Sequence, residues 1–320
     1  MNVVSLFSGA GGFDLGFIQA GHEVIWANDI DKDCGETYKH NIGNHFILAD
    51  IKDIATIEIP DCDIVIGGFP CQGFSMANRN RTIEDERNQL YLEFVRVVKD
   101  KKPKYFVAEN VRGLLSIGKG EAIKMIVNDF QNIGYCVDYK VFNAADFGVP
   151  QNRNRVIIVG IRKDISTKNF PFPVPTHAQK NNFLQKKWIS IGEALENIAE
   201  PDEEHNLKNH VFSKYKVTDR NFTGHRKTDP DKPSPTILAK NTGGNVAIHH
   251  PKNHRRMSVR ESAIIQTFPL DFEFIGSMGS MYRQIGNAVA VLFAKQIALE
   301  FSKLETKSIK KEINELELVL

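Results

Sequence analysis

Short apolar runs alternate with longer amphipathic stretches through the first half of the chain. Most of the runs end at Gly, Asn, Asp or Glu, a pattern typical of buried parallel strands. Seven strands are expected, over residues 3–7, 23–27, 46–49, 63–66, 104–108, 137–142 and 155–160. Apolar residues at helical spacing between them predict helices from about residue 13, over 88–99 and over 123–133. This alternation predicts an α/β fold with a doubly wound, mostly parallel seven-stranded sheet.

The pattern changes at Phe170, where Pro171, Pro173 and Pro175 interrupt it. The segment that follows is polar, with short strand candidates at 236–239 and 245–248. A domain of different character is therefore expected over residues 171–252.

Helical spacing returns after this segment. A helix is expected to start within 255–263, and 284–290 is expected to open a last helix that packs back on the first domain. The tail, 304–320, predicts a charged amphipathic helix. The expected organisation is a first domain over 1–170, a second, smaller one over 171–252, and a C-terminal segment, 253–320, that returns to the first.

The composition is that of an ordinary globular protein, with 42% hydrophobic and 25% charged residues among 320. We expect no membrane span and no signal peptide, because no apolar run approaches about 18 residues and no basic region precedes an apolar one at the start. The four cysteines, at 34, 62, 71 and 136, form no Cys-x-x-Cys pair. This spacing favours a reduced, cytoplasmic protein with neither disulfides nor structural zinc.

The net charge of +2 is unevenly distributed. Residues 170–260 contain 15 Lys and Arg against 9 Asp and Glu, whereas the rest of the chain has 26 against 30. A basic segment suggests an anionic partner such as nucleic acid. A solvated basic surface without a partner would give the same count.

The stretch from Gly67 to Ser75 directly follows the strand expected at 63–66. Two glycines end the strand, Pro70 fixes the backbone, and Cys71 follows at once. This order places a thiol at the carboxyl end of a strand, where open α/β sheets bind their ligands. The alternative is that Cys71 is a small buried apolar residue.

The strand at 3–7 leads into a glycine-rich turn, which allows backbone N–H groups to approach a ligand at a helix N-terminus. Asp14 stands where the dinucleotide-binding fingerprint has its third glycine, which disfavours NAD. A carboxylate here could instead lie near a positively charged ligand. Asp29 and Asp50 end the second and third strands, a position that holds ribose hydroxyls in such folds, although each could simply cap a helix.

Further charged residues follow in the first domain. The polar stretch 77–87 contains three arginines and predicts a basic loop beside Cys71, and Glu109 ends the strand at 104–108. Arg153 and Arg155 alternate at the start of a strand, so their guanidinium groups lie on one face. They could clamp a carboxylate or a phosphate, or be plain surface charges.

Together these stretches resemble the cytosine-C5 DNA methyltransferases, most closely the compact bacterial restriction–modification type. The resemblance covers roughly residues 2–300, with one departure at Phe69, where many members have a second proline. Its motifs occur in the family's order: Phe7-Ser8-Gly9-x-Gly11-Gly12, Pro70-Cys71-Gln72, Glu109-Asn110-Val111, Gln151-x-Arg153-x-Arg155 and Gly286-Asn287-Ala288-Val289.

The resemblance implies a mechanism of covalent catalysis. The Cys71 thiolate would add to carbon 6 of a flipped-out cytosine and activate carbon 5 for the methyl group of S-adenosylmethionine, leaving S-adenosylhomocysteine. Glu109 would hold the N3 edge of the base, and Arg153 and Arg155 would steady the ring and Glu109. No metal is needed.

The resemblance also implies a cofactor pocket. Phe7 would contact adenine, the glycine turn the methionine end, Asp29 the ribose hydroxyls and Asp50 the adenine amino group. The full set expected in this pocket is Phe7, Gly9, Gly11, Gly12, Asp29, Ile30, Asp50, Ile51, Pro70 and Asn287.

The implied partner is double-stranded DNA, bound by a monomer in the bacterial cytoplasm at the nucleoid. The loop 77–87 would close over the flipped base, and 171–252 would recognise the target sequence. A cognate restriction endonuclease could belong to the same system without stable contact. The candidate DNA-contacting residues are Gln72, Ser75, Arg79, Arg87, Arg226, Lys240 and Asn241.

Three other functions stay open at this point. A relative with the same chemistry could methylate cytosine in transfer RNA. A Rossmann-like oxidoreductase would bind a nicotinamide cofactor, against the evidence of Asp14. A non-enzymatic DNA-binding module would bind its sequence without S-adenosylmethionine and would not need Cys71.

Overall fold

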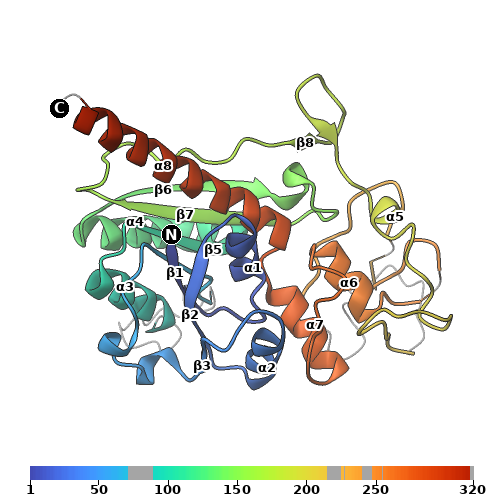
Figure 1. Cartoon of the computed structure of the whole chain (residues 1–320). Coiled ribbons are helices and arrows are strands. Elements are labelled where there is room, and N and C mark those ends of the chain that lie inside the picture. The colour runs from blue at the N-terminus through green and yellow to red at the C-terminus, as the bar shows by residue number, and fades with distance from the viewer. Residues whose placement is uncertain (71–88, 215–224, 227, 240–246, 254, 318–320) are drawn as a thin grey trace.

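The computed structural model describes residues 1–70, 89–214, 225–226, 228–239, 247–253 and 255–317. A larger lobe contains the central sheet, and a smaller lobe contains helices α5, α6 and α7 (Figure 1). The helices are α1 (Gly12–Gln19), α2 (Lys32–Asn41), α3 (Gln89–Lys101), α4 (Glu121–Asn132), α5 (Ile191–Ala194), α6 (Val259–Ile265), α7 (Met278–Asn287) and α8 (Val291–Glu317).

The sheet has seven strands in the order β3-β2-β1-β4-β5-β7-β6. The first five strands of the chain are parallel, and β7 runs antiparallel to both β5 and β6. The expectation of a mostly parallel seven-stranded sheet is therefore confirmed. The strands are β1 (Asn2–Leu6), β2 (Glu23–Asp29), β3 (Phe46–Leu48), β4 (Ile64–Gly67), β5 (Tyr105–Val111), β6 (Tyr135–Asn143) and β7 (Asn154–Arg162).

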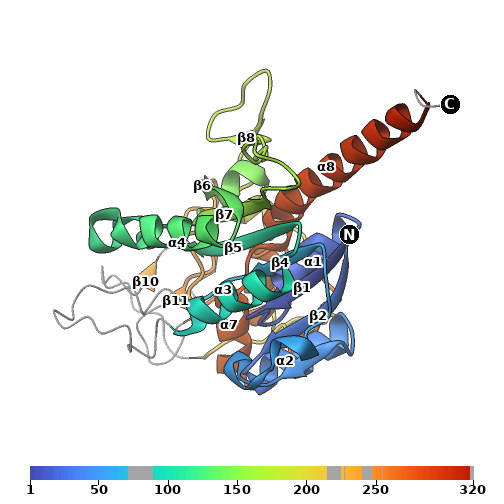
Figure 2. The same ribbon diagram turned by 90° about the vertical axis from the view of Figure 1, so that its left-hand side faces the viewer.

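Both faces of the sheet are covered, which explains the continuous apolar runs. Val3 and Ile64 belong to a core cluster with α1 and α8, whereas their neighbours Val4 and Val65 belong to a second cluster with α3 and α4. Figure 2 shows the two helix layers on opposite sides of the sheet. Strand order reverses between β1 and β4, and the crevice at such a point is where open α/β sheets bind ligands.

The chain after residue 275 differs from the expectation that 284–290 opens the last helix. This stretch ends α7 instead, because Ala288 leaves helical geometry at φ −62°, ψ 147°, and α8 begins at Val291. The expected helix of the tail is present over the described residues 304–317, as the last part of α8.

The strand candidate at 236–239 is wrong, because side chains hold this segment in place of a strand partner. The Ile237 N–H donates to Gln151 Oε1 at 3.0 Å, and Thr236 Oγ1 donates to the Asn152 carbonyl at 2.6 Å. At 245–248 only β11 (Ala247–Ile248) is described, paired with β10 (His225–Arg226). A second two-residue pair, β8 (His177–Ala178) with β9 (Lys186–Lys187), follows Phe170.

The smaller lobe has a hydrophobic core that draws on both sides of residue 252. Ile191 and Ile237 pack there with Met257, Phe268 and Ile285. Helices α6 and α7 therefore contribute to this core, and α8 contributes to that of the larger lobe.

One stretch of the described residues, Met278–Thr306, is long and apolar enough to cross a membrane by composition, with mean hydropathy 1.2 over its most apolar window. In the structure 56% of that window is buried in the protein, and α7 and α8 are separate helices within it. Packing against α1 and the sheet accounts for its apolar character.

Candidate functional site

Two adjoining cavities open at the carboxyl ends of β1 and β4, with volumes of about 1070 and 380 Å³. They share the lining residues Phe7, Asp29, Ile30, Pro70 and Leu90. The larger cavity extends to the junction of α7 and α8. The crevice anticipated from the strand order therefore contains both of these cavities.

Phe7 stands at the boundary of the two cavities, and its backbone adopts the left-handed conformation at φ 55°. Such a conformation costs a non-glycine residue about 1–3 kcal/mol, and strained residues of this kind cluster at ligand sites. The next N–H group, of Ser8, is held by the Asn28 carbonyl at 2.9 Å. The end of β1 is therefore fixed so that Phe7 lines both cavities.

Asp29 fastens the glycine turn to the end of β2. Its Oδ2 accepts from the Gly9 N–H at 2.9 Å, and its Oδ1 accepts from the Asp31 N–H at 2.9 Å. Burial raises the pKa of this carboxyl. Asp31, not Asp29, caps α2, so the simple capping role does not account for Asp29.

The smaller cavity contains the second acid. Asp50 lines it together with Ile51 and Ile30. The Asp50 side chain also accepts from the Lys52 N–H at 3.1 Å, so this acid does cap the short 3₁₀ helix Ile51–Asp53. Its carboxylate is at once a cap and part of the cavity wall.

Gly11 and Gly12 lie behind the cavity wall and line neither cavity. A Cβ on Gly11, at φ 87°, would stand 2.3 Å from Ile42 Cδ1, and one on Gly12 would stand 2.6 Å from the Val289 carbonyl oxygen. The close packing of α1 against its neighbours explains why both positions need glycine. A contact of either glycine with the cofactor stays a prediction.

Asp14 lines neither cavity, and the expectation that it could lie near a positively charged ligand stays a prediction. The residue is fully buried. Its carboxylate accepts from Ser5 Oγ at 2.7 Å and from the Tyr38 hydroxyl at 2.8 Å. Ser5, in turn, lines the larger cavity.

Glu109 and Arg155 form an ion pair inside the larger cavity. Arg155 Nε lies 2.6 Å from Glu109 Oε1, and both side chains are largely buried. The antiparallel pairing of β5 with β7 brings them together from positions 46 residues apart, since Val111 pairs with Arg155. Gly68 lies beside them, because a Cβ there would be 3.4 Å from Glu109 Oε2.

Arg153 lines the same cavity but makes different contacts. Its guanidinium donates to the carbonyls of Ile237 at 3.1 Å, Gly286 at 3.0 Å and Ala288 at 2.9 Å. Burial, reinforced by the charge of Arg155, lowers the pKa of Arg153 to about 9. Arg153 therefore joins β7 to the smaller lobe and to the α7–α8 junction.

The sequence assigned no function to Asn110, but the structure gives its side chain a contact next to the expected nucleophile. Its Nδ2 donates to the Phe69 carbonyl at 2.9 Å, which fixes the backbone two residues before Cys71. The Phe69 ring packs on Tyr91 and Phe94, with centroids 5.2 and 5.8 Å away. The only sequence signal was the position of Asn110, directly after Glu109.

Several expected site residues lie outside the described part of the chain. They are Cys71, Gln72, Ser75, Arg79, Arg87, Lys240 and Asn241, together with the loop 77–87. Arg226 is described only as a backbone position in β10. Pro70, the last described residue before Cys71, lines both cavities.

The other three cysteines are free thiols. Burial raises the pKa of Cys62 to about 12 and also raises that of Cys34, which makes both poor nucleophiles. Within the described ranges, no cluster of three or more His, Cys, Asp and Glu side chains could hold a metal ion.

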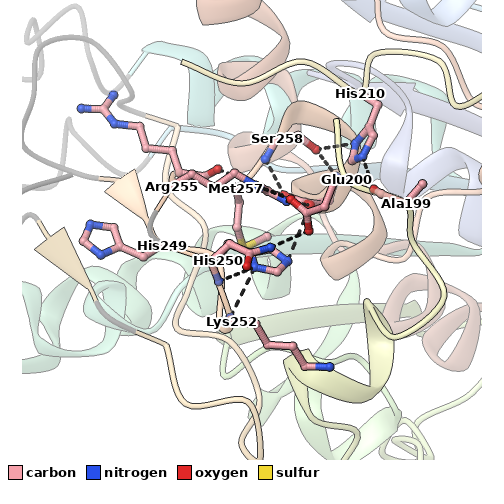
Figure 3. A network of polar contacts seen from close by, with 12 residues as sticks. Ala199, Glu200, His210, His249, His250, Lys252, Arg255, Met257 and Ser258 are labelled. Carbon is pink, nitrogen blue, oxygen red and sulfur yellow. Dashed lines mark hydrogen bonds and ion pairs between the residues drawn. The ribbon is translucent and has the colours of Figure 1, made fainter. Parts of the chain in front are cut away.

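A second polar network lies in the smaller lobe, away from both cavities (Figure 3). Arg255 binds Glu261 with both terminal nitrogens, at 2.8 and 2.6 Å, and Glu200 through Nε at 2.9 Å. Burial alone would raise the pKa of Glu261, but the bonds from Arg255 outweigh it and lower that pKa. His210 extends the network, binding Ser258 Oγ at 2.8 Å and the Ala199 carbonyl at 2.7 Å. The network ties α6 to the segment around residue 200.

Comparison with known proteins adds to this geometry. The family model of C-5 cytosine-specific DNA methylases matches residues 1–232 and 213–303. Type II methyltransferase M.NgoFVII of Neisseria gonorrhoeae is 43% identical over 332 residues, which cover 94% of this chain and 87% of that protein. Type II methyltransferase M.FnuDI of Fusobacterium nucleatum is 38% identical and covers 98% of each chain.

Solved structures agree with the fold. A DNA modification methyltransferase encoded within a prophage of E. coli matches with a TM-score of 0.73 and 25% identity, over 96% of this chain and 99% of that one. The S. pombe Dnmt2 methyltransferase matches with a TM-score of 0.69 over 95% and 98%, and its 22% identity bears on the fold alone.

Proposed function

Because the chain belongs to the C-5 cytosine-specific DNA methylase family, we propose that its larger cavity receives the target cytosine and that Cys71, Glu109 and Arg155 act on it. The chain is a DNA (cytosine-5-)-methyltransferase, as the family and its Type II relatives show. Family membership does not assign roles to individual residues, and the roles given below are proposals.

The proposed chemistry begins with Cys71. Its thiolate forms a bond to carbon 6 of the ring, which moves electron density to carbon 5. When bound, S-adenosylmethionine supplies an electrophilic methyl group for carbon 5 and leaves as S-adenosylhomocysteine. Loss of the carbon-5 proton and elimination of the Cys71 thiolate then restore the aromatic ring.

Glu109 is proposed to bind the N3 edge of the cytosine and to share a proton there, which offsets the charge that builds up on the ring. Arg155 holds that carboxylate through the 2.6 Å ion pair. This pair carries the proposal, since it lies in one cavity with Pro70, the residue that precedes Cys71. Arg153 is proposed to steady the same wall through the carbonyls that it binds.

The cofactor fits the smaller cavity and its opening into the larger one. An adenosine needs an apolar face and acceptors for hydroxyl and amino groups, and Phe7, Ile30 and Ile51 supply the former while Asp29 and Asp50 supply the latter. Gly9, Pro70 and Asn287 line the way toward Glu109. We assign the ribose to Asp29 and the adenine amino group to Asp50; Gly11 and Gly12 support the turn.

The substrate is DNA, as the family implies. A base stacked in a duplex cannot enter an internal cavity, so the cytosine is proposed to be flipped out. We assign target recognition to residues 171–252, with base and phosphate contacts from Gln72, Ser75, Arg79, Arg87, Arg226, Lys240 and Asn241. The enzyme is proposed to act as a cytoplasmic monomer and as the modification half of a restriction–modification system, whose endonuclease needs no stable contact with it.

Bisulfite sequencing tests this function. DNA from cells that express the chain should contain protected cytosines at one short recurring sequence, and DNA from cells that express Cys71→Ala should contain none. The variant should still bind S-adenosylmethionine, because Cys71 takes no part in the proposed cofactor pocket. Substantial protection by Cys71→Ala would rule out the assigned nucleophile.

Transfer RNA is the second candidate substrate, and the comparisons do not favour it, because the matched family model and relatives are DNA methylases and Type II methyltransferases. If bisulfite sequencing finds no protected cytosines in DNA although the protein is folded and binds S-adenosylmethionine, RNA becomes the substrate to test. The oxidoreductase and the non-enzymatic module do not fit the family that the chain belongs to.

A further inference from the structure

Asp14 is a buried carboxylate that the proposed mechanism does not use. It is 0% exposed and stands in the first turn of α1, directly below the glycine turn. Both of its oxygens accept from neutral hydroxyls, Ser5 Oγ and the Tyr38 OH. In the described part of the chain it forms no ion pair, so its charge is stabilised by hydrogen bonds and by the N-terminus of α1 alone.

The surroundings of Asp14 add negative rather than positive charge. Burial, with a smaller contribution from the charge of Asp29, raises the pKa of Asp14 to about 6, although the hydrogen bonds from Ser5 and Tyr38 lower it. Tyr38 donates its only proton to Asp14 and so accepts from His45 Nε2, 3.0 Å away, whose pKa burial lowers. Cys34, also on α2, is neutral because burial raises its pKa. Each titratable neighbour is thus neutral or anionic near pH 7.

Ser5 connects this carboxylate to the larger cavity, because it lines the cavity and donates its hydroxyl to Asp14 at 2.7 Å. A buried charge without a partner is costly, and a cation bound nearby reduces that cost. The cavity is proposed to receive a ligand whose reacting centre is a sulfonium cation. The ligand can therefore bring a positive charge toward a carboxylate that forms no ion pair in the described part of the chain.

We propose that the Asp14 carboxylate, acting through Ser5 from behind the cavity wall, favours the sulfonium cation of S-adenosylmethionine over neutral S-adenosylhomocysteine. The inference rests on the proposed cofactor site. After methyl transfer the positive charge on sulfur is gone, so this attraction acts on the cofactor and not on the product. Asp14 is then a selectivity residue that helps the product leave, without touching either molecule.

Binding constants test the inference without any turnover. Asp14→Asn removes the charge at nearly constant shape, and Tyr38→Phe, the matched control, removes one hydrogen bond from Asp14 and keeps the charge. Calorimetry on the full chain at pH 7.5 should find that Asp14→Asn weakens the binding of S-adenosylmethionine by about tenfold or more, which corresponds to at least about 1.4 kcal/mol. Affinity for S-adenosylhomocysteine should change by less than about twofold. Tyr38→Phe should keep the ratio of the two affinities.

Equal weakening of both ligands by Asp14→Asn would show a purely structural role and would overturn the inference. Sinefungin has an ammonium group in place of the sulfonium, so Asp14→Asn should weaken its binding by a factor similar to that for S-adenosylmethionine. A wild-type protein that binds neither adenosyl ligand would contradict the proposed cofactor site itself, and this inference with it.

The pH dependence of the two affinities provides a second test. Asp14 is ionised above pH about 6 and neutral below it, so the preference for S-adenosylmethionine should be present at pH 7.5 and lost by pH 5. Asp29 lines the cavity and also titrates, so the ratio is measured over the same pH range on Asp14→Asn, whose remaining pH dependence is the contribution of Asp29. A ratio that stays constant from pH 7.5 to 5 would overturn the inference.

Discussion

Arg155 lies in β7 and Arg153 directly precedes that strand, and both line the same cavity, yet their side chains bind different partners. Arg155 pairs with one carboxylate, that of Glu109, whereas Arg153 donates to three backbone carbonyls. Their alternation in the sequence predicted that the two guanidinium groups share a face, and in the structure both residues line the larger cavity. It could not predict the difference in partners, because the three carbonyls come from segments more than 80 residues away.

Arginine-to-lysine exchanges should separate these two roles. Arg153→Lys should lower the free energy of unfolding by about 2–3 kcal/mol, because one ammonium group cannot serve three carbonyls in a fork geometry and buried acceptors lose their donors. Arg155→Lys should lower it by less than about 1 kcal/mol, because lysine keeps a cation beside Glu109. Urea unfolding of both variants measures the difference, and equal losses would contradict the assigned contacts.

Other residues of the candidate site differ in whether the sequence could predict them. Asp29 and Asp50 were expected around an adenosine because they end neighbouring strands, and strand ends meet at one edge of a parallel sheet. Phe7 was expected there from the family resemblance alone. All three residues line the smaller cavity. Asn110 was missed, since an amide that binds a backbone carbonyl leaves no pattern. Cys71 remains a prediction, because it lies outside the described residues.

At the scale of elements, the strands were easier to predict than the helices. A strand covered on both faces must be apolar at every position, as in β4 and the first half of β5, and such runs are conspicuous. Helix α2 buries only Cys34, Gly35, Thr37 and Tyr38, too few apolar residues to show a helical period. The junction of α7 and α8 was misread because apolar residues continue across the break at Ala288.

Helix α8 depends on a close approach to α1, which one glycine permits. A Cβ on Gly16 would stand 2.3 Å from Ala294 Cβ and 2.8 Å from the Val291 carbonyl oxygen, both on α8. Gly16→Ala should therefore lower the free energy of unfolding by about 1–3 kcal/mol, despite the better helix propensity of alanine.

The matched control for this substitution is Gly279→Ala in α7, where an added Cβ meets nothing within 4 Å. It should leave the free energy of unfolding unchanged or raise it by up to about 1 kcal/mol. Denaturant unfolding of the two variants is the measurement. A Gly16→Ala protein as stable as the wild type would mean that the two helices are less closely packed than the structure has them.

For the whole molecule, the sequence correctly predicted a second region of different character but not how its core is built. The smaller lobe packs Ile191 and Ile237 against Met257 and Phe268, from segments that no local pattern connects. The boundaries at 170 and 252 came from composition, and composition reports a change in surface and loops rather than which apolar residues meet.

Exchange of residues 171–252 for the corresponding segment of a related methyltransferase should change which DNA sequence is modified and leave methyl transfer intact. The chimera needs apolar residues at positions 191, 195 and 237, because these complete the core with α6 and α7. Bisulfite sequencing identifies the new target. A folded, active chimera with the original target would refute the assignment of recognition to this segment.

The contacts of Arg153 also bear on how such enzymes can diversify. Every residue has a backbone carbonyl, so an arginine that binds the carbonyls at 237 and 288 makes no demand on the side chains there. The smaller lobe can therefore accumulate substitutions, and acquire new target sequences, while its attachment to the catalytic sheet stays the same. An anchor of this kind separates the evolution of specificity from the preservation of chemistry.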